Sequence, residues 1–346
     1  MPYLKFYLQN TDKKKHNVHV LYWNRDGRED ELEEDITYHE FSEKMDDDIK
    51  KYKKIHSFLK FRKVAVDILD KEKYDLVFLL HSMPAVLLHD YVKKNYRNRY
   101  IFDYRDYTYE KISFYKKIIY SVVKNSMVTF VSSDDFRRFL PDSDKIYTSH
   151  NLLTDSLNYR IKKEKHYPVR IGFWGYIRHE NINRQIIKKI SQDKRFELHF
   201  YGREQAIACN LKKYASEINA ENVFFHGEYN AADRYKFAAE TDIIHNAYGN
   251  DEMPSQKYAV SNKYYDGLIF YIPQMCTKQS YMGDKVEKEK TGIAFDFSKD
   301  NFTEELWQYY NAFDYNEFCD NCDKLLDKIL REFEEGKEII KNAIES

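Results

Sequence analysis

The sequence predicts an α/β protein with two tandem Rossmann-like, doubly wound domains. Short apolar runs alternate with helical patterns along all 346 residues, and strands separated by helices pair in parallel through right-handed crossovers. A chain of this length also exceeds the size at which one core usually keeps growing. The Lys-rich stretch 155–167 lacks regular apolar spacing. It therefore predicts a linker between a first domain at 1–154 and a second domain at 168–346 that ends in helices.

The first domain contains alternating strand and helix patterns. The predicted strands are 18–23, 75–80, 100–103, 128–131 and 146–148, and the predicted helices are 3–13, 50–73, 84–96, 110–124 and 134–140. Doubly wound domains normally begin with a strand that lies in the middle of the sheet, but this chain opens with helical spacing. We therefore expect the N-terminal sheet to lack its first, central strand, and we expect the gene upstream of Met1 to encode that strand.

The second domain repeats the pattern. Its predicted strands are 169–173, 196–201, 223–226, 242–245, 268–272 and 292–295, with helices between them and two more from about residue 301 to the end. The first strand runs into Gly175, and a helical pattern starts near Asn181. Glycine lets a backbone approach a ligand closely, and Arg178 in the same turn can reach a phosphate.

A second candidate ligand loop lies in the stretch SQKYAVSNKYYDGLIFYIP, residues 255–273. Ser261, Asn262 and Lys263 stand at the start of a predicted helix, where free amides favour an anion. Asp266 follows about one turn later and can accept hydrogen bonds from two sugar hydroxyls. The two loops together predict a nucleotide-diphosphate site. The alternative for this segment is an ordinary helix start with a surface lysine.

The composition limits the classes of protein. A net charge of −1 argues against a nucleic-acid binder, although residues 50–126 hold 18 basic against 8 acidic residues. No apolar run is long enough to span a membrane and the N-terminus lacks the layout of a secretory signal, so we expect a cytoplasmic protein. Four cysteines fit a reducing compartment. Cys319 and Cys322 form a single CxxC without a second pair, which favours unreactive helix residues over a zinc site.

These motifs together resemble the GT-B-fold glycosyltransferases, most closely glycosyltransferase family 4 and its bacterial polysaccharide-assembling relatives. The segment SNKYYDG, residues 261–267, is similar to the family's PNK-x-x-E-x segment at the helix facing the donor nucleotide. Supporting segments are IGFWGYIR, FHGEY, TDIIHNAYG with Tyr248, TFVSSD and SHN. The resemblance covers nearly the whole chain.

The resemblance implies a retaining hexosyl transfer from a nucleotide sugar to a glycan or lipid-linked acceptor in cell-surface polysaccharide synthesis, with no metal and no separate cofactor. The donor-binding residues that it implies are Gly175, Tyr176, Arg178, Arg203, Tyr248, Ser261, Asn262, Lys263 and Asp266. The negative charge of a departing nucleoside diphosphate would meet Arg, Lys and a helix N-terminus.

The sequence departs from the family pattern at Tyr258, which stands where many relatives have the first acid of a Glu-x7-Glu pair, and at the missing first strand. Two alternatives therefore stay open. One is a non-catalytic GT-B partner of an active transferase, and the other is a nucleotide-sugar epimerase of the same fold.

On the acceptor side, Asp103 and Asp106 stand at the end of a predicted strand, at the ligand-binding edge of a parallel sheet. They are the catalytic candidates, with an Asp–Arg ion pair as the structural alternative and His81 as a weaker candidate. Lysines in the helical pattern 110–124 alternate with apolar residues, as in a helix at an anionic membrane surface. Peripheral membrane attachment through residues 50–126 is therefore expected, and the alternative is a helix whose apolar face is its core side.

Overall fold

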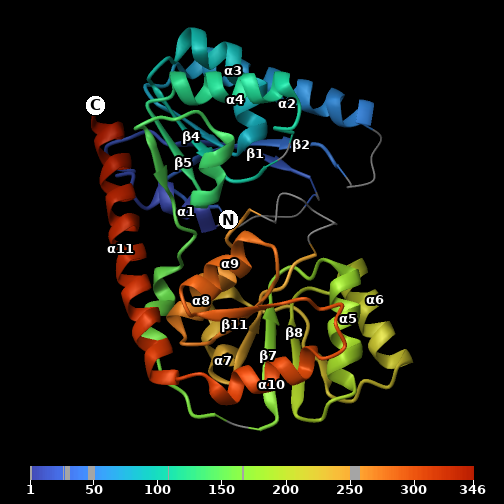
Figure 1. Cartoon of the computed structure of the whole chain (residues 1–346). Coiled ribbons are helices and arrows are strands. Elements are labelled where there is room, and N and C mark those ends of the chain that lie inside the picture. The colour runs from blue at the N-terminus through green and yellow to red at the C-terminus, as the bar shows by residue number, and fades with distance from the viewer. Residues whose placement is uncertain are drawn as a thin grey trace. The chain divides into compact units, whose positions relative to one another are not determined.

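The computed structural model describes residues 2–25, 27, 32–45, 51–107, 109–165, 167–249 and 258–346. The chain divides into two compact units, each an α/β unit with parallel strands (Figure 1). Unit 1 consists of residues 1–149 and 333–346, and unit 2 consists of residues 150–332. The predicted fold class is confirmed.

Unit 1 opens with the helix α1 (Pro2–Leu8). Two parallel strands, β1 (His19–Asn24) and β2 (Thr37–Ser42), pair with each other. A separate parallel sheet has the order β3 (Val77–Leu80), β4 (Tyr100–Tyr104), β5 (Val128–Val131) and β6 (Ile146–Thr148). The helical segments of this unit are α2 (Lys51–Glu72), α3 (Ser82–Asn95), α4 (Ser113–Asn125) and the 3-10 helix η1 (Asp134–Phe139). Within the described residues no strand precedes β1, as the sequence predicts.

Unit 2 contains one continuous parallel sheet in the order β12-β11-β10-β7-β8-β9. The strands are β7 (Val169–Trp174), β8 (Phe196–Tyr201), β9 (Val223–Phe225), β10 (Ile243–His245), β11 (Gln274–Thr277) and β12 (Gly292–Phe295). The helical segments are η2 (Thr154–Tyr159), α5 (Glu180–Ser191), α6 (Ala206–Glu217), η3 (Ala231–Asp233), α7 (Arg234–Ala239), α8 (Asn262–Ile269), α9 (Tyr281–Lys288), α10 (Phe302–Ala312) and α11 (Tyr315–Glu345), which continues into unit 1.

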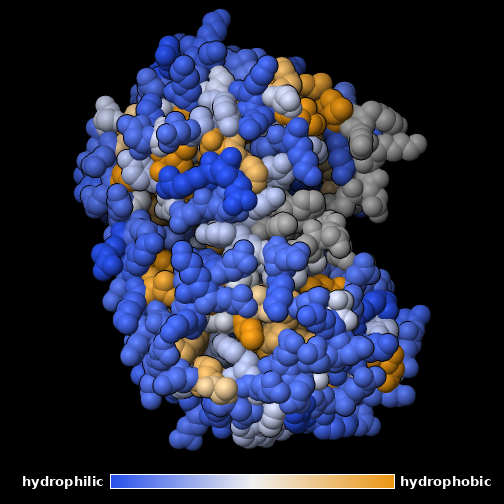
Figure 2. Space-filling model, in the orientation of Figure 1, coloured by the Kyte–Doolittle hydropathy of each residue, from blue (hydrophilic) through white to orange (hydrophobic). Residues whose placement is uncertain are grey.

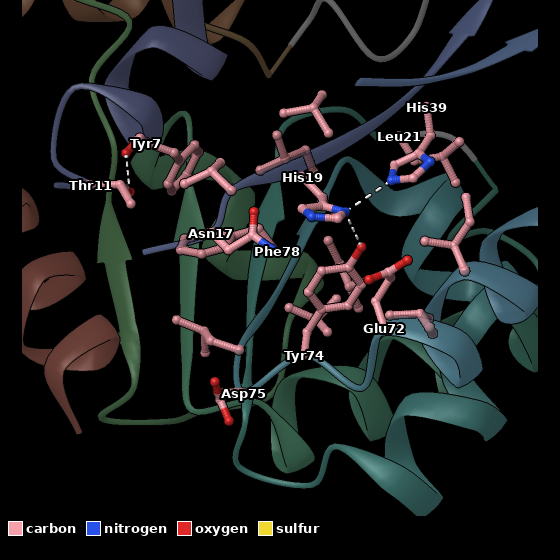
Figure 3. Close-up of a pocket in the computed structure, with 18 of the residues that line it drawn as sticks. Tyr7, Thr11, Asn17, His19, Leu21, His39, Glu72, Tyr74, Asp75 and Phe78 are labelled. Carbon is pink, nitrogen blue, oxygen red and sulfur yellow. Dashed lines mark hydrogen bonds between the residues drawn. The ribbon is translucent and has the colours of Figure 1, made fainter. Parts of the chain in front are cut away.

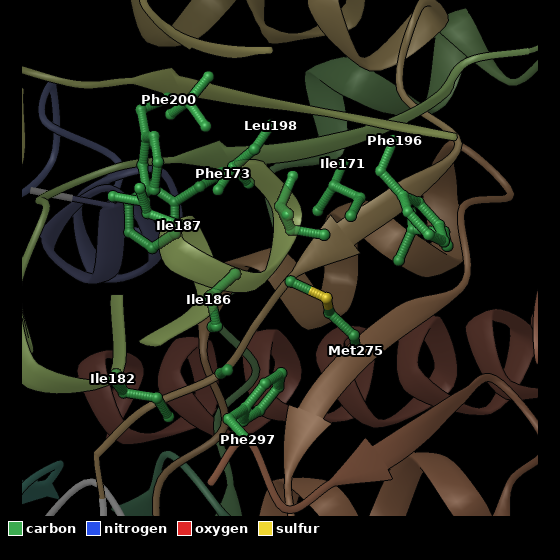
Figure 4. Close-up of a cluster of buried hydrophobic side chains, with 14 of the residues drawn as sticks. Ile171, Phe173, Ile182, Ile186, Ile187, Phe196, Leu198, Phe200, Met275 and Phe297 are labelled. Atoms are coloured by element: carbon green, nitrogen blue, oxygen red, sulfur yellow. The ribbon is translucent and has the colours of Figure 1, made fainter. Parts of the chain in front are cut away.

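The core of unit 2 forms where α5 packs on the sheet. Ile186, Ile187 and Ile190 recur on one face of the helix and are fully buried. Ile171 from β7 and Leu198 from β8 belong to the same apolar cluster (Figure 4). The helical spacing of the isoleucines thus holds α5 against the strands, and it fixes the turn that connects β7 to α5.

Two predictions of secondary structure need correction. Residues 268–272 are not a strand, because α8 continues to Ile269 and the strand is β11, after Pro273. A short apolar run of this kind fits the buried end of a helix as well as a strand. The strand β2 was not predicted, because its alternating side chains are mostly polar or half-exposed.

The unit boundaries also differ from the predicted domains. The segment predicted as a linker, 155–167, belongs to unit 2 because its side chains bind that unit: Arg160 donates to Asp323 at 2.6 Å, and Lys163 donates to the carbonyl of Thr241 at 3.0 Å. The end of α11 belongs to unit 1, where the Phe333 ring lies 5.0 Å from that of Phe6.

Candidate functional site

Glycines follow three of the six strands at the carboxyl edge of the unit 2 sheet. Gly175, Gly202 and Gly227 follow β7, β8 and β9, and the N–H of Gly202 donates to the carbonyl of Gly227 at 2.8 Å. A Cβ on Gly202 would lie 2.3 Å from the carbonyl oxygen of Gly175, so these two turns touch through their backbones. Gly175 has φ +122 and open space where a Cβ would point. A ligand can therefore approach the main chain closely here.

The second predicted segment lies against this edge at the start of α8. Ser261 does not cap the helix, because its hydroxyl donates instead to Asn246 Oδ1 at 2.6 Å. The first amides of α8 therefore receive no hydrogen-bond acceptor from the Ser261 side chain, and they keep the partial positive charge of the helix N-terminus. Asn262 is exposed, and its Oδ1 accepts a hydrogen bond from Asn151 at 2.6 Å.

Lys263 brings a buried positive charge to the same place. Its side chain is 6% exposed, its ammonium donates to the Tyr248 hydroxyl at 2.9 Å, and it lies 4.2 Å from the ring centroid of Phe173 on β7. Within the described parts of the chain, no carboxylate forms an ion pair with it. A buried ammonium held by a hydroxyl and an aromatic face is suited to bind an anion.

The turn after β7 contacts this lysine site through Tyr248. The His179 ring meets the Tyr248 ring edge-on at 5.4 Å. Tyr176 and Arg178 are exposed in the same turn, with the guanidinium of Arg178 4.4 Å above the Tyr176 ring, and Arg203 is half-buried beside Gly202. The two predicted ligand loops therefore lie together, as the sequence analysis expected.

A hydrogen-bond chain from β10 supports the turn. The N–H of Ala247 donates to His245 Nδ1, so His245 Nε2 carries the proton and donates to Asn183 Oδ1 at 2.9 Å. Asn183 then donates to the carbonyls of Arg178 and His179 at 2.6 and 3.0 Å. Burial, followed by the charge of Lys263, lowers the pKa of His245 to about 3. The imidazole is therefore neutral at physiological pH and acts as a fixed donor.

Asp266 lies deeper in the unit than the sequence analysis expected. It is 3% exposed, its Oδ2 accepts from the indole N–H of Trp174 at 2.7 Å, and its Oδ1 lies 3.6 Å from the guanidinium of Arg234. Burial raises the pKa of Asp266, although Arg234 and the indole oppose the shift. The carboxylate thus links β7 to α8 and α7 from the inside of the unit.

The carboxyl edge of the four-stranded sheet in unit 1 carries the acidic candidates. Asp103 is fully buried, and its Oδ2 accepts from Arg105 Nε at 2.7 Å. Arg105 also donates to the Ser149 hydroxyl at 3.1 Å. This is the buried ion pair that was the structural alternative for Asp103.

Asp106 is placed differently. Its side chain is about half exposed, and its Oδ2 lies 2.7 Å from His81 Nε2. The N–H of Met83 donates to His81 Nδ1, so His81 donates from Nε2 to Asp106. His81 directly follows β3 with φ 91, a conformation that is strained for a side chain of this size. The two residues form an accessible His–Asp pair.

The apolar residues of the lysine-rich helix divide into two groups. Ile118, Ile119, Val122 and Val123 of α4 are buried and form its core side, as in the structural alternative. Ile112 and Phe114, at the start of the helix, are 56% and 72% exposed. Figure 2 shows hydrophobic patches of unit 1 near α2 and α4 within a mostly hydrophilic surface. None of the helices in the described part of the chain is long and apolar enough to cross a bilayer.

Some predicted positions cannot be placed, and some site residues were not predicted. Residues 250–257, which include the start of the SQKYAVSNKYYD stretch, lie outside the described residues. Arg234, Asn183 and His245 could not be predicted as site residues, because their roles depend on contacts with residues far away in the chain. The one signal in the sequence was His245 itself, a histidine at the end of the apolar segment TDIIH, where a buried polar side chain needs a hydrogen-bond partner.

Neither a family model nor a curated protein matches the sequence. Solved structures do resemble the chain. Sucrose-phosphate synthase from Thermosynechococcus elongatus has a TM-score of 0.69 at 11% identity, covering 99% of this chain and 88% of its own. A glycosyltransferase from Rickettsia africae has a TM-score of 0.60 at 14% identity, and the match covers 90% of this chain and 86% of the glycosyltransferase. HepE from Anabaena in complex with UDP has a TM-score of 0.62 at 11% identity, and the match covers 89% of this chain and 87% of HepE. With its two parallel α/β units, the chain has the GT-B fold.

Proposed function

We propose that the chain is a metal-independent glycosyltransferase that moves a hexosyl group from a nucleotide-diphosphate sugar to a glycan or lipid-linked acceptor, with retention of anomeric configuration, in cell-surface polysaccharide synthesis. The observation that carries the proposal is Lys263, a buried ammonium at an open helix start beside a glycine edge. The GT-B fold and the UDP bound to HepE support a nucleotide-sugar donor.

In this proposal unit 2 binds the donor. The diphosphate lies on the Gly175 turn and the first amides of α8, with Lys263 neutralising the charge that develops as the sugar leaves. Tyr248 orients the ammonium, while the exposed Arg178 and the half-buried Arg203 supply further positive charge at the edge. Asn262 and Ser261 complete the polar lining. The chemistry needs this positive field because the leaving group gains negative charge in the transition state.

Asp266 acts in this scheme as a positioning residue. The resemblance assigns it to the ribose, but its carboxylate is buried against Trp174 and Arg234. It holds the end of β7 to α8, and so keeps the Gly175 turn and Lys263 in register. A direct ribose contact would require the Asp266 side chain to leave both partners.

On the acceptor side, Asp106 is better suited to chemistry than Asp103. Asp106 is accessible and receives a hydrogen bond from His81, which keeps the carboxylate oriented toward a hydroxyl group. Asp103 neutralises the buried Arg105 and so supports the strand end from within. We assign the orientation of the acceptor hydroxyl to Asp106, and a positioning role to Asp103.

Calorimetry with UDP, GDP, ADP and CMP, followed by transfer and hydrolysis assays, tests the proposal. Lys263→Met should weaken binding of the preferred nucleoside diphosphate by roughly 10- to 100-fold, the range of a hydrogen bond to a charged group. Lys288→Met, an exposed lysine on α9, is the matched control and should leave affinity unchanged.

The assays also separate the two alternatives. Binding without turnover in the presence of acceptors would favour the non-catalytic partner. Interconversion of free nucleotide sugars without an acceptor would favour the epimerase. Equal affinity of the Lys263→Met variant and the wild type would remove the proposed diphosphate site.

Peripheral attachment to an anionic membrane is the second part of the proposal. It is supported by the exposed Ile112 and Phe114 next to Lys111, Lys116 and Lys117. Vesicles with anionic lipids should bind the protein with an affinity that falls as salt rises. Replacing the three lysines with Gln should reduce binding, whereas the same change at Lys194, Lys213 and Lys288 of unit 2 should not. Absence of binding at low salt would contradict the attachment.

A further inference from the structure

The chain passes between its two units twice, after Ser149 and after Glu332. His150 is therefore the first residue of unit 2, and Glu332, on α11, is the last. His150 Nε2 lies 2.6 Å from Glu332 Oε2, and the imidazole is only 10% exposed. One hydrogen bond thus joins the two points at which the chain enters and leaves unit 2.

His150 also contacts α8, the helix that carries Lys263. Its Nδ1 lies 3.1 Å from the Tyr265 hydroxyl, and the two rings meet edge-on with centroids 5.8 Å apart. An ionised carboxylate only accepts hydrogen bonds, so Nε2 carries a proton and donates to Glu332, and a neutral imidazole can then accept at Nδ1 from Tyr265. The hydrogen bond from His150 lowers the pKa of Glu332, which keeps the acceptor ionised at neutral pH.

The residue after His150 holds the start of the same helix. Asn151 Nδ2 donates to Asn262 Oδ1 at 2.6 Å, and Asn262 is the first residue of α8. Two neighbouring residues of one segment therefore contact the first turn of α8, at Asn262 and at Tyr265. A displacement of this turn would break both contacts.

The same segment also holds the other end of α8. Arg160 Nε donates to the carbonyl of Ile269 at 3.3 Å, and Arg160 Nη2 donates to Asp323 of α11 at 2.6 Å. The segment 150–160 thus links α8 to α11 at both ends of the helix.

On the other side of the first crossing, Ser149 is held by unit 1. Its hydroxyl accepts a hydrogen bond from Arg105 at 3.1 Å. Arg105 is the partner of the buried Asp103 and precedes Asp106 in the chain. Adjacent residues are therefore fixed in different units, and a change at His150 reaches Ser149 through one peptide bond.

We propose that His150 is a positioning residue of the diphosphate site, which couples nucleotide binding on α8 to the two points where the chain passes between the units. The inference rests on the proposed nucleotide site. A nucleotide that binds Lys263 and the first amides of α8 fixes the helix, and Tyr265 then holds His150 and Glu332 in place. By linkage, the hydrogen bonds that fix the two crossings also favour the arrangement of α8 that binds the nucleotide.

The variant His150→Phe tests the proposal on the full chain, because it keeps an aromatic ring and removes both hydrogen bonds. Without nucleotide, hydrogen exchange of the α8 amides from Tyr265 to Leu268 should rise at least about threefold. Affinity for the nucleoside diphosphate that the wild type prefers should fall roughly 2- to 10-fold, the range of one hydrogen bond. Nucleotide should slow the exchange of residues 149–153 in the wild type, and this protection should be lost in the variant.

His199→Phe is the matched control, since it removes another histidine–glutamate contact of unit 2. His199 Nε2 lies 3.3 Å from Glu197, and its ring stacks on Phe224 of β9. This variant should change neither the exchange of α8 nor the nucleotide affinity. Tyr265→Phe removes a single hydroxyl, and its effect should not add to that of His150→Phe, because both substitutions break the same contact.

Unchanged exchange of α8 or unchanged affinity in His150→Phe would overturn the inference, and so would additive effects of His150→Phe and Tyr265→Phe. Equal losses in His199→Phe would also overturn it, because they would reflect a general loosening of unit 2. A failure of the proposed function has a different signature, since the wild type itself would then bind none of the nucleotides. The coupling would fall with it, whereas the exchange of α8 would still show whether His150 holds the helix.

Discussion

The two parallel sheets differ at their centres. In unit 2, β7 joins three strands on one side to two on the other, so each interior edge is paired. In unit 1 the corresponding position is a cavity of about 530 Å³, bordered by His19 and Leu21 of β1 and by Phe78 of β3 (Figure 3). The β1-β2 pair meets the rest of the unit through side chains, such as the Trp23 ring that stacks on Phe61 of α2 with centroids 5.6 Å apart. The two sheets therefore differ in their backbone edges: β7 pairs on both sides, whereas within the described residues β1 and β3 each pair on one side only.

The carboxyl edges of the two sheets differ as well. Glycines follow three strands of unit 2, and Gly175 and Gly227 have open space where a Cβ would point, so a phosphate can approach the backbone there. In unit 1, His81 follows β3, and Arg105 and Asp106 follow β4. Side chains that donate or accept protons therefore occupy this edge. One edge is suited to bind a charged group and the other to orient a hydroxyl.

The largest expected effect distinguishes the two aspartates of unit 1. Asp103→Ala should lower the free energy of unfolding by about 3–5 kcal/mol, because it leaves Arg105 buried without its counter-charge. Asp106→Ala should cost less than about 1 kcal/mol, since its side chain is half exposed. Urea unfolding measures both changes. A loss of transfer activity in Asp106→Ala at unchanged stability would support its proposed role, and equal stability losses in the two variants would contradict this assignment.

The next largest expected difference is in the stability that is lost when a side chain is truncated at the centre of each sheet. Ile171→Ala removes a fully buried side chain from β7 and should cost about 3 kcal/mol. Leu21→Ala, on the cavity side of β1, should cost about 1 kcal/mol, because its side chain is only partly buried and adds to an existing cavity. Equal costs would show that the cavity is closed in solution.

The neutral His245 predicts an acid-sensitive unit 2. Its pKa is about 3 in the folded chain, against about 6.5 when unfolded. Below pH 6.5 the unfolded state therefore binds a proton that the folded state excludes, and stability falls as pH falls through this window. At pH 5 the loss from this group is about 2 kcal/mol. Unfolding between pH 7 and 5 should show a smaller slope for His245→Gln than for the wild type, and an unchanged slope would contradict a neutral His245.

Most of the strands could be predicted from the sequence, because their apolar or alternating residues are flanked by polar ones. Val128–Val131, Phe196–Tyr201 and Gly292–Phe295 have the predicted limits. The failures occurred where the local pattern was ambiguous. The run after Gly267 suits the end of a helix and a strand equally, and β2 alternates polar and half-exposed side chains without an apolar run.

The site was predictable only where one segment carried the chemistry. The Gly175 turn and the start of α8 each had a local signature, and the structure brings them together. Arg234 from α7 and Asn183 from α5 had none, because their partners lie on other elements. The burial of Asp266 was equally hidden, since the indole of Trp174 reaches it from a different strand.

The last prediction concerns that indole. Trp174→Phe removes the hydrogen bond to Asp266 but keeps an aromatic ring beside Phe237, whose centroid lies 5.3 Å from that of Trp174. The free energy of unfolding should fall by about 1.5 kcal/mol, the lower range for a hydrogen bond to a charged group. Nucleotide affinity should fall less than in Lys263→Met, because Trp174 reaches the proposed diphosphate site only through Asp266. Calorimetry of both variants measures the losses of nucleotide affinity, and urea unfolding measures the losses of stability. If Trp174→Phe abolishes nucleotide binding without a loss of stability, Trp174 or Asp266 contacts the nucleotide directly, and the buried carboxylate is more than the internal link between β7 and α8.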